Sequence, residues 1–272
     1  MTVVDFHVHV AKLGMWTPWV HEYMKKVNPV VYESFDRNMT PSGVLKLMDE
    51  EGVDFAVLLA EIAPLTTGVV NNKFIAKFCG ENERLIPFAS INPVTDPNPP
   101  KTLARVVEDF GMKGLKLLPP YQYFYPNDTK FHPLYAKAQD LNIPVVFHTG
   151  SSIFKNAKLR FGNPLYLDDL AVDFPDLTII QAHGGRAFWY NIAYFLAKRH
   201  RNVYIEISGL PPKNLLRYFP DLEKIGEKII FGSDWPGVPS VKANIEAIQE
   251  LPLMTETKRK ILGENALKLL KL

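Results

Sequence analysis

Residues 144–148 read Pro-Val-Val-Phe-His and are followed by Thr149 and Gly150. The run is almost continuously apolar and lacks the alternation of a strand that has one face in water. This pattern is typical of a parallel strand that is covered on both faces. Because parallel strands are joined by long crossover connections, usually helices, we expect further runs of this kind with helices between them.

Seven more short apolar runs recur along the chain, at residues 3–10, 55–60, 85–91, 114–118, 177–183, 203–207 and 229–232. Segments with helical spacing separate the runs. One begins at Thr40 and Pro41, which suit the N-cap and the first position of a helix, and another ends at Gly111. From the second run onward, successive runs end roughly 25–35 residues apart, which is about one strand–helix unit. Eight units predict an α/β fold, a distorted (β/α)8 TIM barrel, rather than a doubly wound sheet.

Two features refine this prediction. The spacing after the first run is much longer than the others, which predicts a long loop after strand 1, at residues 11–38, on the face where barrel active sites lie. Apolar residues with helical spacing in residues 255–272 predict an amphipathic closing helix. Since no linker interrupts the pattern, residues 1–272 are predicted to form a single domain.

Composition excludes several classes of protein. Apolar residues make up 47% of the chain, which a disordered protein lacks, and a net charge of +2 gives no basic surface for nucleic acid. A single cysteine, Cys79, excludes a disulfide framework and a cysteine-based zinc cluster. No apolar run approaches a membrane span, and the first residues do not resemble a signal peptide. We expect a cytoplasmic protein that binds a small molecule, without nucleic-acid or membrane partners; whether it forms a homodimer is left open.

Four of the seven histidines lie at or near predicted strand ends; they are His7, His9, His148 and His183. Strand periodicity places the first two on one face together with Asp5. Asp234 follows the eighth strand. Closure of the barrel would bring its carboxylate to the same upper interior as the four imidazoles.

Imidazoles and a carboxylate that converge in this way predict a divalent metal site. Zn²⁺ takes such ligands at about 2.0–2.2 Å, and Mn²⁺ and Mg²⁺ are the alternatives. The ion would lower the pKa of a bound water to about 7. His183 and Asp234 are then candidates for proton transfer. A lone His-x-His pair is more often structural, so the prediction depends on the convergence of separate strand ends.

Several motifs together resemble the amidohydrolase superfamily. They are His7-Val8-His9, Lys113-Gly114-Leu115-Lys116-Leu117, His148-Thr149-Gly150, His183-Gly184-Gly185, Gly232-Ser233-Asp234-Trp235-Pro236 and Ile261-Leu262-Gly263-Glu264-Asn265-Ala266. The nearer similarity is to the family-2 branch, which includes aminocarboxymuconate-semialdehyde decarboxylase-like and dicarboxylate-lactonase enzymes. The motifs span nearly the whole chain in the same order.

The resemblance implies a distorted barrel with its site at the carboxyl ends of the strands. It implies that His7, His9, His148 and Asp234 hold one metal, and that His183 is an acid/base or electrophilic group. The chain departs from the two-metal members, which bridge their ions with a carbamylated lysine or a glutamate near strand 4. The decarboxylases of the branch are also usually longer than this chain.

Four further residues are predicted to bind substrate. Lys116 ends the fourth strand; we favour a free ammonium that binds a substrate carboxylate over a carbamate bridge or a side chain that snorkels to solvent. Arg186 follows the sixth strand and suits a carboxylate. Trp19 and Tyr121 belong to aromatic segments that would wall an apolar pocket, with loop packing or a subunit interface as the alternative.

These observations favour a metal-dependent hydrolase that cleaves a C–N or C–O bond in a small carboxylated or cyclic substrate through a metal-activated water. The alternative is a lyase, a non-oxidative decarboxylase or hydratase acting on an unsaturated or aromatic carboxylic acid. A catalytically silent metal-binding barrel is a third reading, but the proton-transfer groups beside the predicted metal argue against it.

Overall fold

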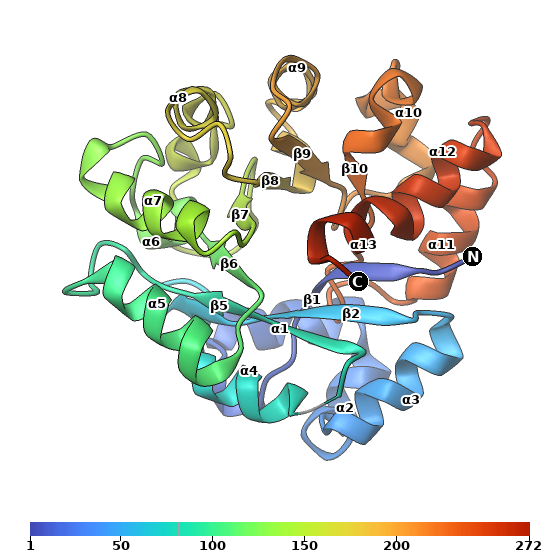
Figure 1. Ribbon diagram of the computed structural model, residues 1–272. Helices are drawn as coiled ribbons and strands as arrows, with labels where there is room; N and C mark the ends of the chain where they lie inside the picture. The colour runs from blue at the N-terminus through green and yellow to red at the C-terminus, as the bar shows by residue number, and fades with distance from the viewer. Residues whose placement is uncertain (81) are drawn as a thin grey trace.

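A computed structural model of the chain describes residues 1–80 and 82–272. Within these residues, eight parallel strands run around a central axis in the order β1-β2-β5-β6-β7-β8-β9-β10, with helices outside them (Figure 1). The strands are β1 (Val4–Val8), β2 (Phe55–Leu59), β5 (Leu85–Ser90), β6 (Gly114–Leu117), β7 (Val145–His148), β8 (Ile179–Ala182), β9 (Val203–Glu206) and β10 (Ile229–Ile230). Each strand falls within one of the predicted runs, so the predicted TIM-like α/β barrel is confirmed.

Backbone hydrogen bonds between the first strand and the segment after the last one almost close the ring. The amide of Phe6 donates to the carbonyl of Phe231 at 3.0 Å, and the amide of Asp234 donates to the carbonyl of His7 at 2.9 Å. The amide of His9 donates to the carbonyl of Trp235 at 2.8 Å. This closure places the His-x-His segment directly beside the segment that carries Asp234.

The connection after β1 is long, as expected, but it is largely helical rather than irregular. It contains α1 (Pro18–Val27) and α2 (Pro29–Asn38), each of which begins with proline at its first position. Proline suits that position because its fixed φ matches the helix and its missing N–H would be unpaired there. A second unpredicted feature is the antiparallel hairpin of β3 (Glu61–Ala63) and β4 (Gly68–Val70).

The other helices cover the outside of the barrel. Thr40 caps α3 by accepting a hydrogen bond from the amide of Gly43 at 3.1 Å, as predicted. The bounds are α3 (Pro41–Glu51), α4 (Asn72–Cys79), α5 (Pro99–Phe110), α6 (Pro119–Gln122), α7 (His132–Asp140), α8 (Tyr166–Asp173), α9 (Tyr190–Arg199), α10 (Leu215–Tyr218), α11 (Val241–Gln249), α12 (Thr255–Arg259) and α13 (Asn265–Leu270). Among the described residues, none of the helices has the length and apolar character needed to cross a bilayer.

The barrel interior is filled by a compact apolar cluster. It contains Val4, Phe6, Val57, Leu59, Ile86, Phe88, Val146, Ile180, Ala182, Ile230 and Ala266. Leu267 and Leu270 of α13 pack against this cluster, and α13 lies across one opening of the ring (Figure 1). The predicted closing segment therefore seals the amino-terminal end of the barrel, and the carboxyl end remains for the site.

Candidate metal centre and active site

An irregularity in β1 decides which of its side chains reach the site. Register with β2 shifts between Asp5 and Val8. Phe6 belongs to the interior cluster, yet the next residue, His7, lines the cavity together with His9. Asp5 lies on the outer side of the strand, where its carboxylate accepts the amide of Ser233 at 2.8 Å. The expectation that Asp5 shares a face with both histidines is wrong, because a bulge changes strict alternation and re-aims side chains.

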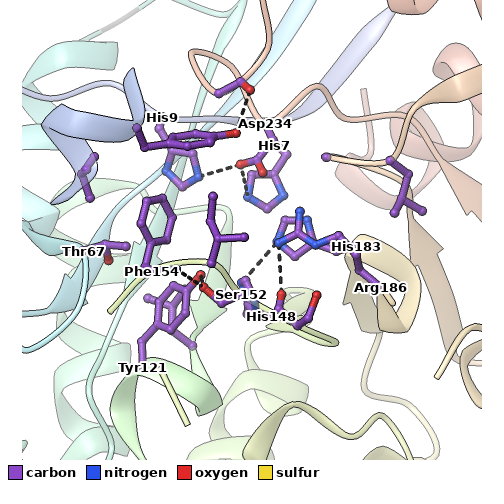
Figure 2. Close-up of a pocket in the computed structure, with 18 of the residues that line it drawn as sticks. His7, His9, Thr67, Tyr121, His148, Ser152, Phe154, His183, Arg186 and Asp234 are labelled. Atoms are coloured by element: carbon purple, nitrogen blue, oxygen red, sulfur yellow. Dashed lines mark hydrogen bonds and ion pairs between the residues drawn. The ribbon is translucent and has the colours of Figure 1, made fainter. Parts of the chain in front are cut away.

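The carboxyl ends of the strands surround a cavity of about 440 Å³. Figure 2 shows side chains converging on it from opposite walls. Its polar lining includes His7, His9, Lys116, His148, His183, Arg186 and Asp234. Aromatic side chains form much of the remaining wall; they are Trp16, Tyr23, Tyr121, Phe154, Tyr190 and Tyr218. The predicted polar residues therefore share one cavity.

Three potential metal ligands form a tight group. Ligand atoms of His7, His9 and Asp234 all lie within 4.8 Å of one another. Oδ1 of Asp234 is 3.7 Å from Nε2 of His7 and 3.3 Å from Nε2 of His9. His148 is not part of this group in the described structure and lies beside His183 (Figure 2).

Hydrogen bonds outside the group determine which imidazole nitrogens remain free. Nδ1 of His183 lies 3.0 Å from the carbonyl of Ser208, which only accepts, so this nitrogen carries the proton. Nε2 of His183 must then accept from Nδ1 of His148, 3.2 Å away. Nε2 of His148 keeps its lone pair; it is buried and has no hydrogen-bond partner among the described residues. Such an orphaned nitrogen is what a metal ligand would show, so the donor set fits a divalent ion.

Burial and neighbouring charge keep most of the imidazoles neutral. Burial, aided by the charge of Lys116, lowers the pKa of His7 and His148 well below the ordinary value. Burial and the charge of Arg186 do the same to the pKa of His183. Neutral imidazole is the form that ligates metals.

In contrast, the interaction between His9 and Asp234 shifts the pKa of each residue toward its charged form. Burial works against the charge of His9, but its hydrogen bond with Asp234 and the charge of Glu61 raise its pKa. Burial alone would raise the pKa of Asp234, but the hydrogen bond from His9 and the nearby His7 hold it well below the ordinary value. Asp234 is therefore the anionic member of the group.

Lys116 is buried behind the histidines. Its Nζ lies 3.4 Å from Nε2 of His7, which excludes the alternative of a snorkelling side chain. Burial lowers the pKa of Lys116 to about 8, against the opposing charges of Glu206 and Asp234. Burial likewise raises the pKa of Glu206 to about 7, against the charge of Lys116. These two side chains balance part of each other's charge inside the barrel.

Arg186 reaches the cavity from the segment after β8. Its Nη2 donates to the carbonyl of Ser151 at 3.1 Å. Gly209 makes room for the guanidinium, because an added Cβ would lie 2.5 Å from Nη1 of Arg186 and 3.0 Å from Oδ2 of Asp234. His183 and Asp234 adopt left-handed φ values of 64° and 67°. Non-glycine residues in this region are uncommon, and such strained residues cluster at functional sites.

Of the two aromatic residues predicted to bind substrate, Tyr121 lies in the cavity wall and Trp19 does not. Tyr121 lines the cavity, its ring lies tilted against that of His148 with centroids 4.7 Å apart, and its hydroxyl shares a hydrogen bond with Ser152 at 2.9 Å. Trp19 is not among the lining residues; its indole instead donates to the carbonyl of Thr66. Trp16 lines the cavity in its place.

Sequence reasoning missed Glu61 and Thr67, which also line the cavity. Glu61 lies on β3, and Thr67 lies in the turn between β3 and β4. The strands of this hairpin are too short to be recognised by periodicity. A signal was nevertheless present. Glu61 directly follows the end of the second predicted strand, the position from which barrel residues reach the active site.

Similar folds are found among solved structures. An uncharacterised TIM-barrel protein from Bordetella bronchiseptica is 22% identical, with a TM-score of 0.82, over 100% of this chain and 99% of that one. A dihydroxybenzoic acid decarboxylase from a Polaromonas species, with bound manganese and the inhibitor 2-nitroresorcinol, is 17% identical with a TM-score of 0.76, over 100% and 97%. A probable 2-pyrone-4,6-dicarboxylic acid hydrolase from Acinetobacter baumannii, with citric acid bound, is 18% identical with a TM-score of 0.69, over 100% of both chains.

These identities are low, so the likeness to solved structures establishes the fold alone. No curated protein matches the sequence. The family model described as amidohydrolase matches residues 4–272, which is nearly the full length. The match includes the His-x-His segment on β1 and the segment that carries Asp234 after β10, and this chain therefore belongs to the amidohydrolase family.

Proposed function

We propose that the protein is a metal-dependent, non-oxidative decarboxylase that acts on a small aromatic or unsaturated carboxylic acid. One observation carries the proposal. Potential metal ligands and the cations Lys116 and Arg186 face a single cavity whose remaining wall is largely aromatic. Such a cavity suits a flat, apolar molecule that carries an anionic group. Similarity in fold to a dihydroxybenzoic acid decarboxylase supports the same choice.

His7, His9, His148 and Asp234 are proposed to hold one divalent ion. Support comes from the close group of three ligand atoms and from the orphaned Nε2 of His148. When bound, the ion would supply positive charge that stabilises negative charge developing on the substrate. Mn²⁺ replaces Zn²⁺ as the preferred ion, because the similar decarboxylase contains manganese.

Lys116 and Arg186 would neutralise and orient the substrate carboxylate, and the aromatic wall would exclude water from it. In the reaction, the bond between the carboxyl carbon and the ring or vinyl carbon breaks, its electron pair stays on that carbon, and CO₂ leaves. The carbon then takes one proton. Asp234 and His183 are proposed to transfer this proton, because both line the cavity beside the cationic residues. Asp234 is anionic at rest, so it would first take up the proton from water and then pass it to the carbon.

A hydrolase remains the second candidate. The similar fold of the probable 2-pyrone-4,6-dicarboxylic acid hydrolase favours it, and the same side chains could position a water against a lactone or amide carbonyl. In that case the bond broken is C–O or C–N, and no CO₂ is released.

A substrate panel distinguishes the two functions. Protein loaded with Mn²⁺ is incubated with hydroxybenzoates and unsaturated acids, and separately with lactones and amides. We expect CO₂ release from at least one acid and, in D₂O, deuterium on the carbon that loses the carboxylate. The variant His7→Ala is the control and should release none. Hydrolysis of lactones or amides without any CO₂ release would overturn the proposal in favour of the second candidate.

A further inference from the structure

The hairpin β3–β4 brings a carboxylate into the cavity from outside the barrel sheet. Glu61 is the first residue of β3, where it pairs with Val70 of β4, and the residue is only 4% exposed. It lines the same cavity as the proposed metal ligands. The mechanism proposed above assigns no role to this buried carboxylate.

Glu61 has a defined orientation but is incompletely paired. The hydroxyl of Thr67 donates to Oε1 of Glu61 and is the only hydrogen-bond partner of this carboxylate among the described residues. An ionised carboxylate has two acceptor oxygens, each with room for further donors. Burying such a group without donors is costly, so it favours a ligand that supplies one.

The guanidinium of Arg186 and the carboxylate of Glu61 lie toward opposite sides of the cavity. Figure 2 places Thr67 at one edge, beside Phe154, and Arg186 at the other edge, beside His183. Because Thr67 holds Glu61, the free carboxylate belongs to the edge away from Arg186. A ligand that spans the cavity therefore meets a guanidinium at one end and an acceptor-only anion at the other.

We infer that Glu61 determines the substrate class: a monocarboxylic acid with a hydroxyl or amino group at the end remote from its carboxylate. That group donates a hydrogen bond to Glu61, whereas a second carboxylate at the same end is repelled. The inference rests on the proposed function for the placement of the first carboxylate at Arg186. It goes further in excluding dicarboxylic acids from the site.

Binding of simple probes tests this selection without turnover. The probes are 3- and 4-hydroxybenzoate, benzoate, and the corresponding benzene dicarboxylates, with the Mn²⁺-loaded protein and calorimetry. We expect wild type to bind a hydroxybenzoate about 10-fold or more tightly than benzoate, as for a hydrogen bond to a charged group. The dicarboxylates should bind more weakly than benzoate. In Glu61→Gln, the preference for hydroxybenzoate over dicarboxylate should fall about 10-fold or more.

Glu61→Gln keeps the size of the side chain, and the new amide oxygen can still accept a hydrogen bond from the hydroxyl of Thr67. Glu246→Gln, an exposed position on α11, is the matched control and should leave every ratio unchanged. If Glu61→Gln unfolds, Glu61→Asp serves instead, because withdrawing the carboxylate by one methylene should also weaken the preference. Equal preferences in wild type and variant, or no hydroxybenzoate binding by wild type, would overturn the inference.

The two proposals can fail separately. A preference that depends on Glu61, without CO₂ release from any acid, would leave the inference intact and remove the decarboxylase function. CO₂ release together with a binding preference that does not depend on Glu61 would support the decarboxylase function and remove the inference.

Discussion

Nδ1 of His7 lies 2.8 Å from Oε2 of Glu206, and both side chains are buried at the centre of the barrel. The hydroxyl of Ser208 donates to the same carboxylate oxygen at 2.8 Å. Because the carboxylate accepts a hydrogen bond from Nδ1–H, Nε2 of His7 keeps its lone pair on the side that faces Asp234. Glu206 therefore acts through His7 and positions it rather than touching the substrate.

Removing the charge of Glu206 should weaken metal binding while the fold persists. We expect Glu206→Gln to lower Mn²⁺ affinity about 10–100-fold, the usual effect of losing an outer-shell partner of a ligating histidine. Equilibrium dialysis against a competing chelator measures this affinity. Glu33→Gln, at an exposed position on α2, is the control. Equal affinities in Glu206→Gln and wild type would show that Glu206 does not position His7.

Gly209 should tolerate no side chain. Its φ of +63° is left-handed, and a Cβ would meet both Arg186 and Asp234. We expect Gly209→Ala to lose about 1–2 kcal/mol of unfolding free energy from backbone conformation alone and to lose activity as Arg186 is displaced. Gly14→Ala is the matched control, because nothing lies within 4 Å of its added Cβ. Chemical denaturation and the CO₂ assay provide the readouts. Similar effects of both substitutions would contradict this interpretation.

His183 should matter to turnover more than to metal content. Its Nε2 accepts a hydrogen bond from Nδ1 of His148, and its proposed role is proton transfer. We expect His183→Asn to retain most of the metal and to slow turnover about 10²–10⁴-fold, the usual range for general acid–base catalysis. Arg186→Met should instead weaken binding of an anionic substrate. Metal loss in His183→Asn as complete as in His7→Ala would make His183 a ligand.

Cys79 should be unreactive in the folded protein. It is buried in α4, and burial raises the pKa of its thiol from 9.0 to about 12. Because the thiolate is the nucleophile, labelling at pH 8 should be slower than in denatured protein by a factor on the order of 1,000. The chain has a single cysteine, so the labelling signal is unambiguous. Rapid labelling of the native protein would show that α4 opens readily.

Periodicity predicted the eight strands because each is a continuous apolar run between helices, and strand ends placed His148 and His183 at the cavity. It failed where a local irregularity overrides alternation. The bulge in β1 moves Asp5 to the outside, although its spacing from His7 is that of one strand face. Periodicity could not find Glu61, since β3 has three residues. Nor could it distinguish Trp19 from Trp16, because that choice depends on how α1 is oriented.

Metal analysis of protein purified without chelators tests the central claim most directly. Elemental analysis should find one divalent ion per chain in wild type, and almost none in His7→Ala, Asp234→Ala and His148→Ala. Removal of one strong ligand opens the site in each variant, and His148→Ala tests the ligand that lies outside the close group in the structure. Full occupancy in these variants would contradict the assignment of the ligands. Two ions per chain with a modified Lys116 would contradict the single-metal centre.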